Sequence, residues 1–167
     1  MILSIRKATT DDCLLINQLA SQIWGPTYSD ILSPDQLDYM FEMMYSPLNL
    51  AKQMEEKLHQ FFIVFRNDEP VGYLSIETVS PTHFIIQKIY TLPSVQGKGI
   101  GRFTIEAGIE YLKGLCPEPF KLGLFVNRTN KAVGFYQRLG FQVVDTRDFH
   151  IGNDYYMNDY IMEMEVK

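Results

Sequence analysis

A glycine-rich turn near the middle of the chain is the segment best suited to bind a ligand. It reads Gln96-Gly97-Lys98-Gly99-Ile100-Gly101-Arg102 and has a glycine at every second position, just before an expected helix. Glycines leave backbone N–H groups accessible, and a helix N-terminus carries unsatisfied donors and about half a unit of positive charge. Lys98 and Arg102 add full positive charges. The turn is therefore predicted to bind an anion such as a phosphate.

Two common phosphate-binding motifs do not fit this turn. A P-loop needs Ser or Thr after its Gly-Lys pair to coordinate magnesium, but Gly99 follows Lys98. The dinucleotide-binding motif G-x-G-x-x-G would need a glycine at Arg102. A nucleoside triphosphatase and a Rossmann enzyme are both disfavoured. Taken alone, the glycines could also form only a flexible turn.

A second segment narrows these alternatives. It reads Asn127-Arg128-Thr129-Asn130-Lys131-Ala132-Val133-Gly134-Phe135-Tyr136 and continues to Gly140-Phe141. The two segments together resemble the GNAT superfamily of N-acetyltransferases. The stretch Gln96 to Gly101 is similar to its Q/R-x-x-G-x-G/A signature, and the second segment is similar to its N-x-x-A-x-x-F-Y-x-x-x-G-F pattern. At the level of element order, the resemblance covers the whole chain.

A narrower resemblance concerns the substrate. Thr27-Tyr28, Ser33-Pro34 and Asp159-Tyr160-Ile161-Met162 are similar to PaiA-type spermidine/spermine (polyamine) acetyltransferases. The resemblance implies transfer of the acetyl group of acetyl-CoA to a primary amine of a small molecule such as a polyamine, by direct attack in a ternary complex. Trp24, Tyr28 and Tyr39 lie in the region that walls the acceptor site in this fold, and packing in the core is the alternative role for each of them.

The resemblance also implies where the co-substrate acetyl-CoA binds. Its pyrophosphate would rest on the glycine-rich turn, inside a V-shaped opening between parallel strands over 84–92 and 121–126. Its pantetheine arm would pair with the backbone of Ile89, Tyr90 and Thr91, where a bulge would aim an N–H at the thioester oxygen. Such an oxyanion donor is typically worth about 10²–10³ in rate, so Tyr90 counts as a catalytic candidate. The implied cofactor-binding residues are Ile89, Tyr90, Thr91, Gln96, Gly97, Lys98, Gly99, Ile100, Gly101, Arg102, Asn127, Asn130 and Tyr136.

Two asparagines remain open for contacting the coenzyme arm. The family pattern has an asparagine three residues before Ala132, where this chain has Thr129. Asn127 and Asn130, on either side of that position, are both candidates.

Tyr136 is the leading catalytic candidate. When an amine attacks a thioester the leaving group is a thiolate, and a phenol near the sulfur can donate a proton or a hydrogen bond as the charge develops. The alternative role for Tyr136 is packing on the sheet, which is the role expected of Phe135.

The general base is the least defined part of the site. Members of the family often carry a carboxylate where this chain has Gln87, and an amide cannot take a proton at neutral pH. Proton removal through water to Glu77, in the preceding strand, is the alternative.

Two other functions stay open. A GNAT-fold module that binds acetyl-CoA without turnover would explain Gln87, and a protein or peptide N-acetyltransferase would use the acidic ends of the chain to recruit a basic partner. His59, His83 and His150 lack ligand spacing, so no metal site is predicted. Neither Cys13 nor Cys116 has the context of a nucleophile.

The elements around these motifs predict a mixed sheet covered by helices. Alternating apolar side chains and turn residues indicate strands over 2–7, 60–66, 71–79, 84–92, 121–126, 141–147 and 156–166. Helices are expected around Leu15 to Ile23, over 34–45, from Ser46 to about Leu58, around Ile105 to Leu112 and over 130–139. Ser33-Pro34-Asp35-Gln36 reads as a capping box. The resemblance implies the GNAT acyl-CoA N-acyltransferase fold, an α/β (α+β) architecture. It would have a mostly antiparallel sheet of six to seven strands, splayed between two central parallel strands and flanked by about four helices.

Length, composition and charge predict the general class of protein and its partners. The 167 residues are 46% hydrophobic and 21% charged, which predicts a single globular domain over 1–167. No apolar run approaches the about 20 residues of a membrane span, and no signal peptide is visible, so we expect a cytoplasmic monomer or homodimer with reduced cysteines. The net charge of −5 disfavours nucleic acid as a partner. Residues 88–138 carry +5 and the remainder −10, which predicts two ligands of opposite sign.

Overall fold

The fold is organised around one sheet. The computed structural model describes the backbone of residues 1–167 and every side chain except those of residues 151 and 157. Seven strands lie in the order β1-β2-β3-β4-β5-β7-β6, and only β4 and β5 are parallel neighbours. This confirms the predicted mixed, mostly antiparallel sheet. The strands are β1 (Leu3–Lys7), β2 (Gln60–Arg66), β3 (Glu69–Ser80), β4 (His83–Thr91), β5 (Phe120–Asn127), β6 (Gln142–Gly152) and β7 (Tyr155–Val166).

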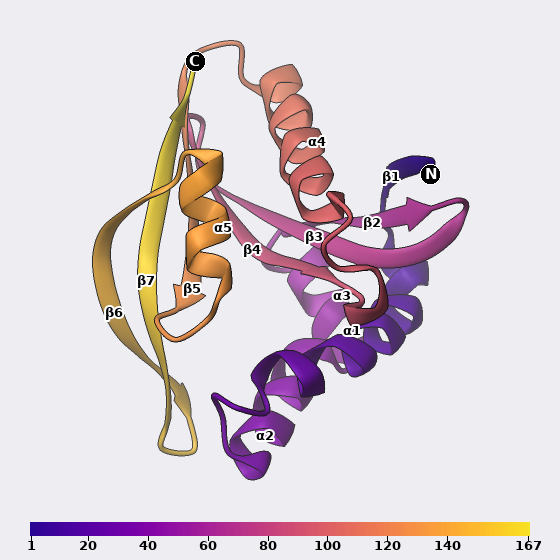
Figure 1. The fold of residues 1–167 in the computed structure, drawn as a ribbon, viewed down its shortest axis with the longest axis vertical. Helices are drawn as coiled ribbons and strands as arrows, with labels where there is room; N and C mark the ends of the chain where they lie inside the picture. Colours follow the sequence, from indigo (N-terminus) through magenta and orange to yellow (C-terminus); the bar gives the residue numbers. More distant parts are fainter.

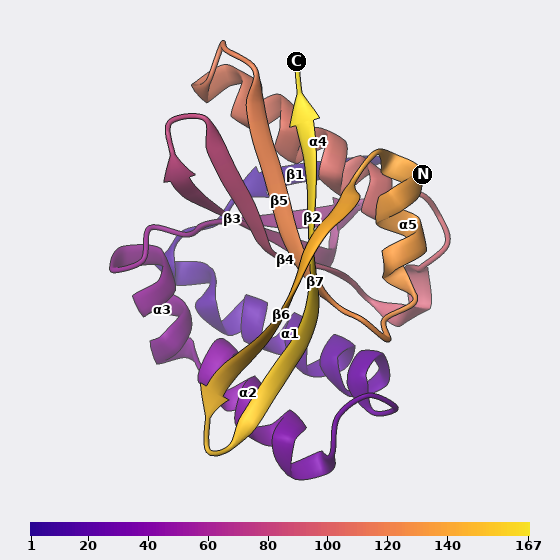
Figure 2. The ribbon, with the colours of Figure 1, turned by 90° about the vertical axis from the view of Figure 1, so that its left-hand side faces the viewer.

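Helices cover both faces of the sheet (Figures 1 and 2). Phe61, Ile63 and Tyr73 pack into the core formed with α1–α3, whereas Phe62 and Leu74 pack into the core formed with α4. Both faces of β2 and β3 are therefore buried, which explains their nearly continuous apolar sequences. There are five α-helices rather than about four: α1 (Cys13–Tyr28), α2 (Pro34–Tyr45), α3 (Pro47–Glu55), α4 (Ile100–Leu115) and α5 (Ala132–Leu139).

The two parallel strands separate half-way along their length. Their pairing runs from His83 opposite Lys121 to Ile86 opposite Leu124, and no pairing is recorded beyond that point. The remainder of β4 turns toward the α1 side while β5 stays with β7 (Figure 1). This is the predicted V-shaped opening, and it creates an edge of unpaired backbone groups inside the molecule.

The bulge in β4 lies at Gln87, not at residues 89–91 as predicted. Lys88 pairs with Ser75 and Ile86 pairs with Ile76, so Gln87 has no partner of its own in β3. From Lys88 to Thr91 the register with β3 is regular. An inserted residue of this kind bends the strand. The bend coincides with the end of the β4–β5 pairing, because Ile86 is the last paired residue of β4 on that side.

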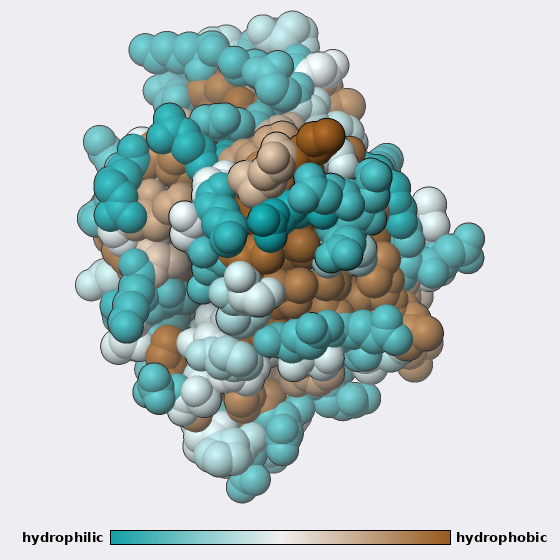
Figure 3. Space-filling view, turned by 45° about the vertical axis from the view of Figure 1, so that its right-hand side comes forward, coloured by the Kyte–Doolittle hydropathy of each residue, from teal (hydrophilic) through white to brown (hydrophobic). Residues whose placement is uncertain are grey.

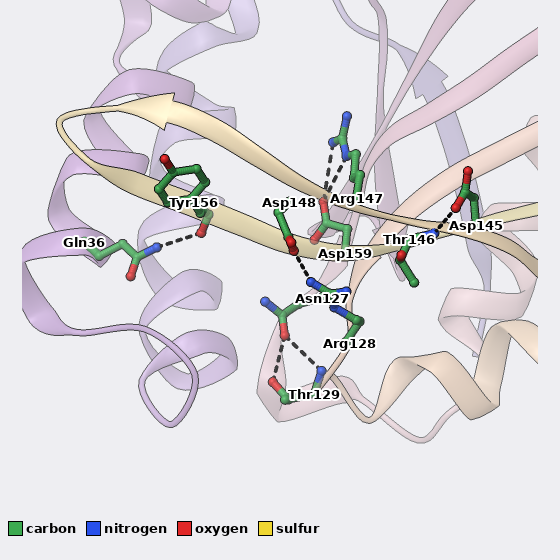
Figure 4. Close-up of polar contacts among 10 residues, drawn as sticks. All are labelled: Gln36, Asn127, Arg128, Thr129, Asp145, Thr146, Arg147, Asp148, Tyr156 and Asp159. Atoms are coloured by element: carbon green, nitrogen blue, oxygen red, sulfur yellow. Dashed lines mark hydrogen bonds and ion pairs between the residues drawn. The ribbon is translucent and has the colours of Figure 1, made fainter.

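The start of α2 is hydrogen-bonded to the hairpin formed by β6 and β7. Ser33 caps the helix by accepting a hydrogen bond from the N–H of Gln36 at 3.2 Å, and Pro34 occupies the first turn. The side chain of Gln36 does not complete the predicted capping box. Its Nε2 donates instead to the carbonyl oxygen of Tyr156 at 3.1 Å (Figure 4). The α1–α2 loop and the β6–β7 hairpin are thereby held side by side.

Some apolar surface remains outside the core. Leu14, Leu48 and Leu58 are each more than half exposed. On the face drawn in Figure 3, apolar side chains gather in the middle and hydrophilic side chains surround them. Cys13 and Cys116 are buried and free. Among the described residues no helix is long and apolar enough to cross a bilayer.

Candidate active site

The opening between β4 and β5 forms a cleft of about 740 Å³. It extends from the C-terminal turn of α1, past the separated strands, to the first turns of α4 and α5. Its lining includes these predicted residues: Ile89, Tyr90, Thr91, Gln96, Gly97, Gly99, Ile100, Gly101, Arg102, Asn130 and Tyr136. Lys98, Asn127 and Glu77 do not line it.

The glycine-rich turn has the backbone geometry of an anion site. Gly97 and Gly99 have φ values of +80° and +79°, a left-handed conformation that strains any other residue. Gly99 caps α4, whose first helical hydrogen bond runs from the N–H of Phe103 to the Gly99 carbonyl at 3.0 Å. The N–H groups of the first turn of α4 therefore have no partner within the helix. The residues of this turn, Ile100, Gly101 and Arg102, line the cleft.

The positive charges beside this turn are fewer than the sequence suggested. Arg102 and Lys131 line the cleft, and Arg102 also pairs with Glu106 at 2.9 Å on the surface. Lys113 and Lys121 pair with Glu110 and Glu163, and neither lysine lines the cleft. Lys88 is buried under α3. The net +5 of residues 88–138 is thus spread over several sites, and only part of it lies at the cleft.

The edge of β4 presents alternate backbone groups to the cleft. The N–H of Leu92 donates to the carbonyl of Val71 in β3 at 2.8 Å, and backbone groups of successive residues point to opposite sides of a strand. The N–H of Tyr90 therefore points to β3, and those of Ile89 and Thr91 point to the cleft. The Thr91 carbonyl confirms this orientation because it accepts from Gln96 Nε2 at 3.2 Å. Tyr90 contributes its side chain, not its N–H.

The two candidate asparagines point to different cavities. Asn130 lines the cleft, and its Oδ1 accepts the Ala132 N–H at 2.8 Å, which leaves its amide nitrogen for a ligand. The Oδ1 of Asn127 accepts from the N–H and the hydroxyl of Thr129 at 3.0 and 2.7 Å (Figure 4). Asn127 lines a second hollow of about 510 Å³. Asn130 is therefore the asparagine placed to contact a ligand in the cleft.

Tyr136 projects from α5 into the cleft and is almost fully buried. Its ring packs against Phe135 and Phe141 at centroid distances of 5.3 and 5.9 Å. Within the part of the chain that is described, its hydroxyl makes no recorded hydrogen bond. Burial raises the pKa of Tyr136 well above its usual value. The phenol is therefore protonated over the whole physiological range.

Tyrosines form the wall of the cleft that faces α1. The hydroxyls of Tyr28 and Tyr90 are hydrogen-bonded at 2.8 Å, and Trp24 packs behind them. Burial raises the pKa of Tyr28 to about 12, with a further contribution from the nearby charge of Asp159. Trp24 itself is buried in the core, and Tyr39 packs on Tyr155 of the hairpin. Of the three aromatics expected here, only Tyr28 lines the cleft.

Glu77 reaches the cleft through the bulged residue. Gln87 lines the cleft and its Nε2 donates to Glu77 Oε1 at 2.7 Å. The other carboxylate oxygen lies 3.9 Å from His59 Nε2. Burial lowers the pKa of His59 to about 4, so this imidazole is neutral at physiological pH.

The second hollow adjoins the cleft. It lies among the α1–α2 loop, the end of β5 and the β6–β7 hairpin, and it shares Ile31 and Thr129 with the lining of the cleft. A ligand that extends from the cleft toward the hairpin would enter this hollow.

The family is decided by a sequence match. The profile of the Acetyltransferase (GNAT) family matches residues 17–141, which include the turn, the separated strands and Tyr136. This chain is a GNAT acetyltransferase. GNAT enzymes use acetyl-CoA, so the fold, the family and the enzyme class predicted from the sequence are confirmed.

Three relatives of this GNAT chain are informative. It is 26% identical to a spermidine N(1)-acetyltransferase of Thermoplasma acidophilum, over 94% of this chain and 96% of that protein. It is 34% identical over 77 residues, 46% of this chain and 45% of that protein, to the peptidyl-lysine N-acetyltransferase YjaB of Salmonella typhimurium. The crystal structure of PaiA N-acetyltransferase from Thermoplasma acidophilum in complex with coenzyme A has a TM-score of 0.82 and 22% identity, and covers 99% of this chain and 100% of that one.

Sequence reasoning missed two residues beside the GNAT cleft. Asp159 is buried and pairs with Arg147 of the neighbouring strand. In the period-two pattern of β7, Asp159 falls on the face with Glu163 and Glu165, which reads as solvent-exposed. The signal that could have found it is Asp159's place in the polyamine-type segment.

Proposed function

We propose that this enzyme transfers the acetyl group of acetyl-CoA to a primary amine of a small molecule, of the polyamine class, by direct attack in a ternary complex. The observation that carries the proposal is the cleft itself, where an anion-binding helix start, unpaired N–H groups of β4 and the Tyr136 phenol line one cavity. The 26% identity to a spermidine acetyltransferase over nearly the whole chain supports the choice of amine.

Groups in the cleft can stabilise the negative charges that develop on the substrate during the reaction. The neutral amine attacks the thioester carbon, the C–N bond forms, and the carbonyl electrons move to oxygen. One of the two cleft-facing N–H groups of β4, that of Ile89 or that of Thr91, is the donor for that oxyanion. The C–S bond then breaks as the carbonyl reforms, and coenzyme A leaves as a thiolate.

Tyr136 stabilises that thiolate by a hydrogen bond. Its pKa is raised by burial, whereas a thiol titrates near about 8.5, so full transfer of the phenolic proton to sulfur is unfavourable. A hydrogen bond that strengthens as charge grows on sulfur lowers the barrier without that transfer.

Gln87 and Glu77 act on the amine. Because the Gln87 amide N–H is donated to Glu77, the Gln87 carbonyl oxygen is the end left to accept a hydrogen bond from the amine. Glu77 holds the amide in this orientation and accepts, through water, the proton that the amine loses. Because Glu77 does not line the cleft, it acts as a base only through this water.

A single amine screen tests the proposed function. Thiol release from acetyl-CoA is followed with spermidine, butane-1,4-diamine, butylamine and a lysine-containing peptide. We expect the highest kcat/KM with a polyamine. Coenzyme binding without turnover of any amine would show a binding module instead.

A peptide acetyltransferase is the second candidate, favoured by the 34% identity to YjaB over part of the chain. Turnover of the peptide alone, together with acetylated proteins found by mass spectrometry of a treated lysate, would establish it.

A further inference from the structure

A buried carboxylate beside the cleft lacks the partners that burial normally requires. Asp159 of β7 is only 1% exposed. Its Oδ1 is buried and has no hydrogen-bond partner among the described residues. Its Oδ2 accepts from Nε and Nη2 of Arg147, both at the long distance of 3.4 Å. Buried carboxylates are normally well hydrogen-bonded, so an incompletely satisfied one points to a ligand.

The cation beside Asp159 is the Arg147 guanidinium, which is held more by stacking on aromatic rings than by its long hydrogen bonds. The Arg147 guanidinium stacks over the rings of Phe125 and Phe149 at 3.5 and 4.7 Å, and the side chain is 29% exposed. A carboxylate and aromatic faces are the two features that bind organic ammonium groups. Arg147 thus marks a cation position that remains in contact with solvent.

Asp159 and Arg147 line neither cavity, but their neighbours on the same face of the sheet line both. Asp159 is directly opposite Asn127 of β5 and Arg147 of β6, so the three side chains share one face of the sheet (Figure 4). On the same strand face, Phe125 lines the cleft and Asn127 lines the hollow. Asp159 also acts electrostatically on Tyr28 in the wall of the cleft.

We infer that Asp159 binds the second, non-reacting ammonium group of a diamine or polyamine acceptor, with Arg147 as the resident cation that this ammonium displaces. The inference rests on the proposed function, because it requires an amine acceptor in the cleft. Exchange of one cation for another keeps the buried charge paired. A slender ammonium can bind Oδ1 as well as Oδ2, and a monoamine has no group to place there. Asp159 therefore sets specificity for acceptors with two or more amines.

The test compares acceptors and a matched variant. We expect Asp159→Asn to lower the ratio of kcat/KM for butane-1,4-diamine to that for butylamine by about tenfold or more, because a charged pair is lost from a buried site. Asp148→Asn is the control. Asp148 lies on the same hairpin and also pairs with an arginine, Arg128, but it is exposed. This variant is expected to keep the wild-type ratio.

A binding measurement keeps the inference separate from turnover. Calorimetric titration of the coenzyme A complex with spermidine should show weaker binding after Asp159→Asn and equal or tighter binding after Arg147→Gln, which removes the competing charge. An unchanged diamine-to-monoamine ratio in folded Asp159→Asn protein would overturn the inference while leaving the proposed function intact. If no amine is acetylated, the proposed function fails. The inference then stands only if spermidine binding still depends on Asp159, and falls if it does not.

Discussion

Tyr136 is the residue whose removal separates chemistry from packing. Tyr136→Phe deletes one hydroxyl and keeps the ring contacts with Phe135 and Phe141. We expect kcat to fall about 10- to 100-fold, with a much smaller change in the KM for acetyl-CoA, since the hydrogen bond is made mainly in the transition state. Steady-state kinetics, with chemistry shown to limit the rate, provide the measurement.

Tyr111→Phe is the matched control for this change. Tyr111 packs on Phe62 in the same core and does not line the cleft, so its hydroxyl can be removed without effect on the reaction. An unaltered kcat for Tyr136→Phe would mean that Tyr136 only packs on the sheet.

Gln87 and Glu77 give a second prediction at this scale. Glu77→Gln removes the carboxylate that accepts a hydrogen bond from the Gln87 amide and that we propose as the acceptor of the amine's proton. We expect kcat/KM for the amine to fall about 10- to 100-fold. The control is Glu110→Gln, which changes a surface carboxylate paired with Lys113 away from the cleft.

The reverse change, Gln87→Glu, places two carboxyls within hydrogen-bonding distance, so that one of them keeps its proton to higher pH. A gain in rate near neutral pH is expected from the added base. A loss of rate in this variant together with full activity of Glu77→Gln would rule out the proposed roles.

At the scale of elements, the bulge in β4 buries a lysine. Lys88 follows the bulged residue, donates to Gln53 Oε1 at 2.5 Å and lies over the rings of Phe61 and Tyr45. Within the described part of the chain, no carboxylate is paired with it. Burial lowers the pKa of Lys88 from 10.5 to about 7. This strand therefore carries a charge whose burial costs stability.

The lowered pKa of Lys88 predicts how the free energy of unfolding changes with pH. Between about pH 7 and pH 10.5 the unfolded chain holds a proton on Lys88 that the folded chain has released, so the free energy of unfolding rises with pH in that window. Below this window Lys88 is charged in both states and its slope vanishes. Lys88→Met is expected to raise the free energy of unfolding at neutral pH by roughly 1–3 kcal/mol and to remove the slope.

Urea unfolding of both proteins at several pH values is the measurement, and Lys113→Met on the surface of α4 is the control. Equal slopes in wild type and Lys88→Met would mean that Lys88 is not the group responsible.

The element order was predictable because each strand and helix carries its own local signal. The period of apolar residues, the prolines after Ser33 and Ser46, and Gly140 at the end of α5 locate the elements to within a few residues. The bulge at Gln87 was not predictable, because its position depends on the register with β3, and both strands remain apolar on either side of it.

The part of the proposed site that would hold the coenzyme was easier to locate from the sequence than the part that would hold the acceptor. The turn from Gln96 to Arg102 and Tyr136 lie in two short segments with characteristic spacing. The proposed acceptor half combines residues of four elements, Tyr28, Phe125, Arg147 and Asp159. No local pattern joins them, and the burial of Asp159 depends on packing from another strand.

At the scale of the whole molecule, the acidic surplus lies outside residues 88–138, and parts of it lie beside the cavities. Asp30 lines the cleft and Asp154 lines the second hollow. The basic surplus is less concentrated, since Lys88 is buried and Lys121 is paired with Glu163. The acidic half of the predicted asymmetry is therefore the part with a clear structural position, near the end of the cleft that faces α1 and the hairpin.

This distribution predicts how salt acts on the reaction. A polyamine carries several positive charges and is attracted over long range by acidic walls, whereas a monoamine carries one. Raising ionic strength from about 20 mM to about 300 mM shortens the Debye length from about 20 Å to about 6 Å, so the attraction is lost beyond the walls of the cleft. We expect kcat/KM for spermidine to fall several-fold over this range and that for butylamine to change less. Measurement at saturating acetyl-CoA removes the coenzyme's own salt dependence. An equal relative decrease in kcat/KM for the two amines, or no decrease for spermidine, would show that the acidic segments do not steer the acceptor.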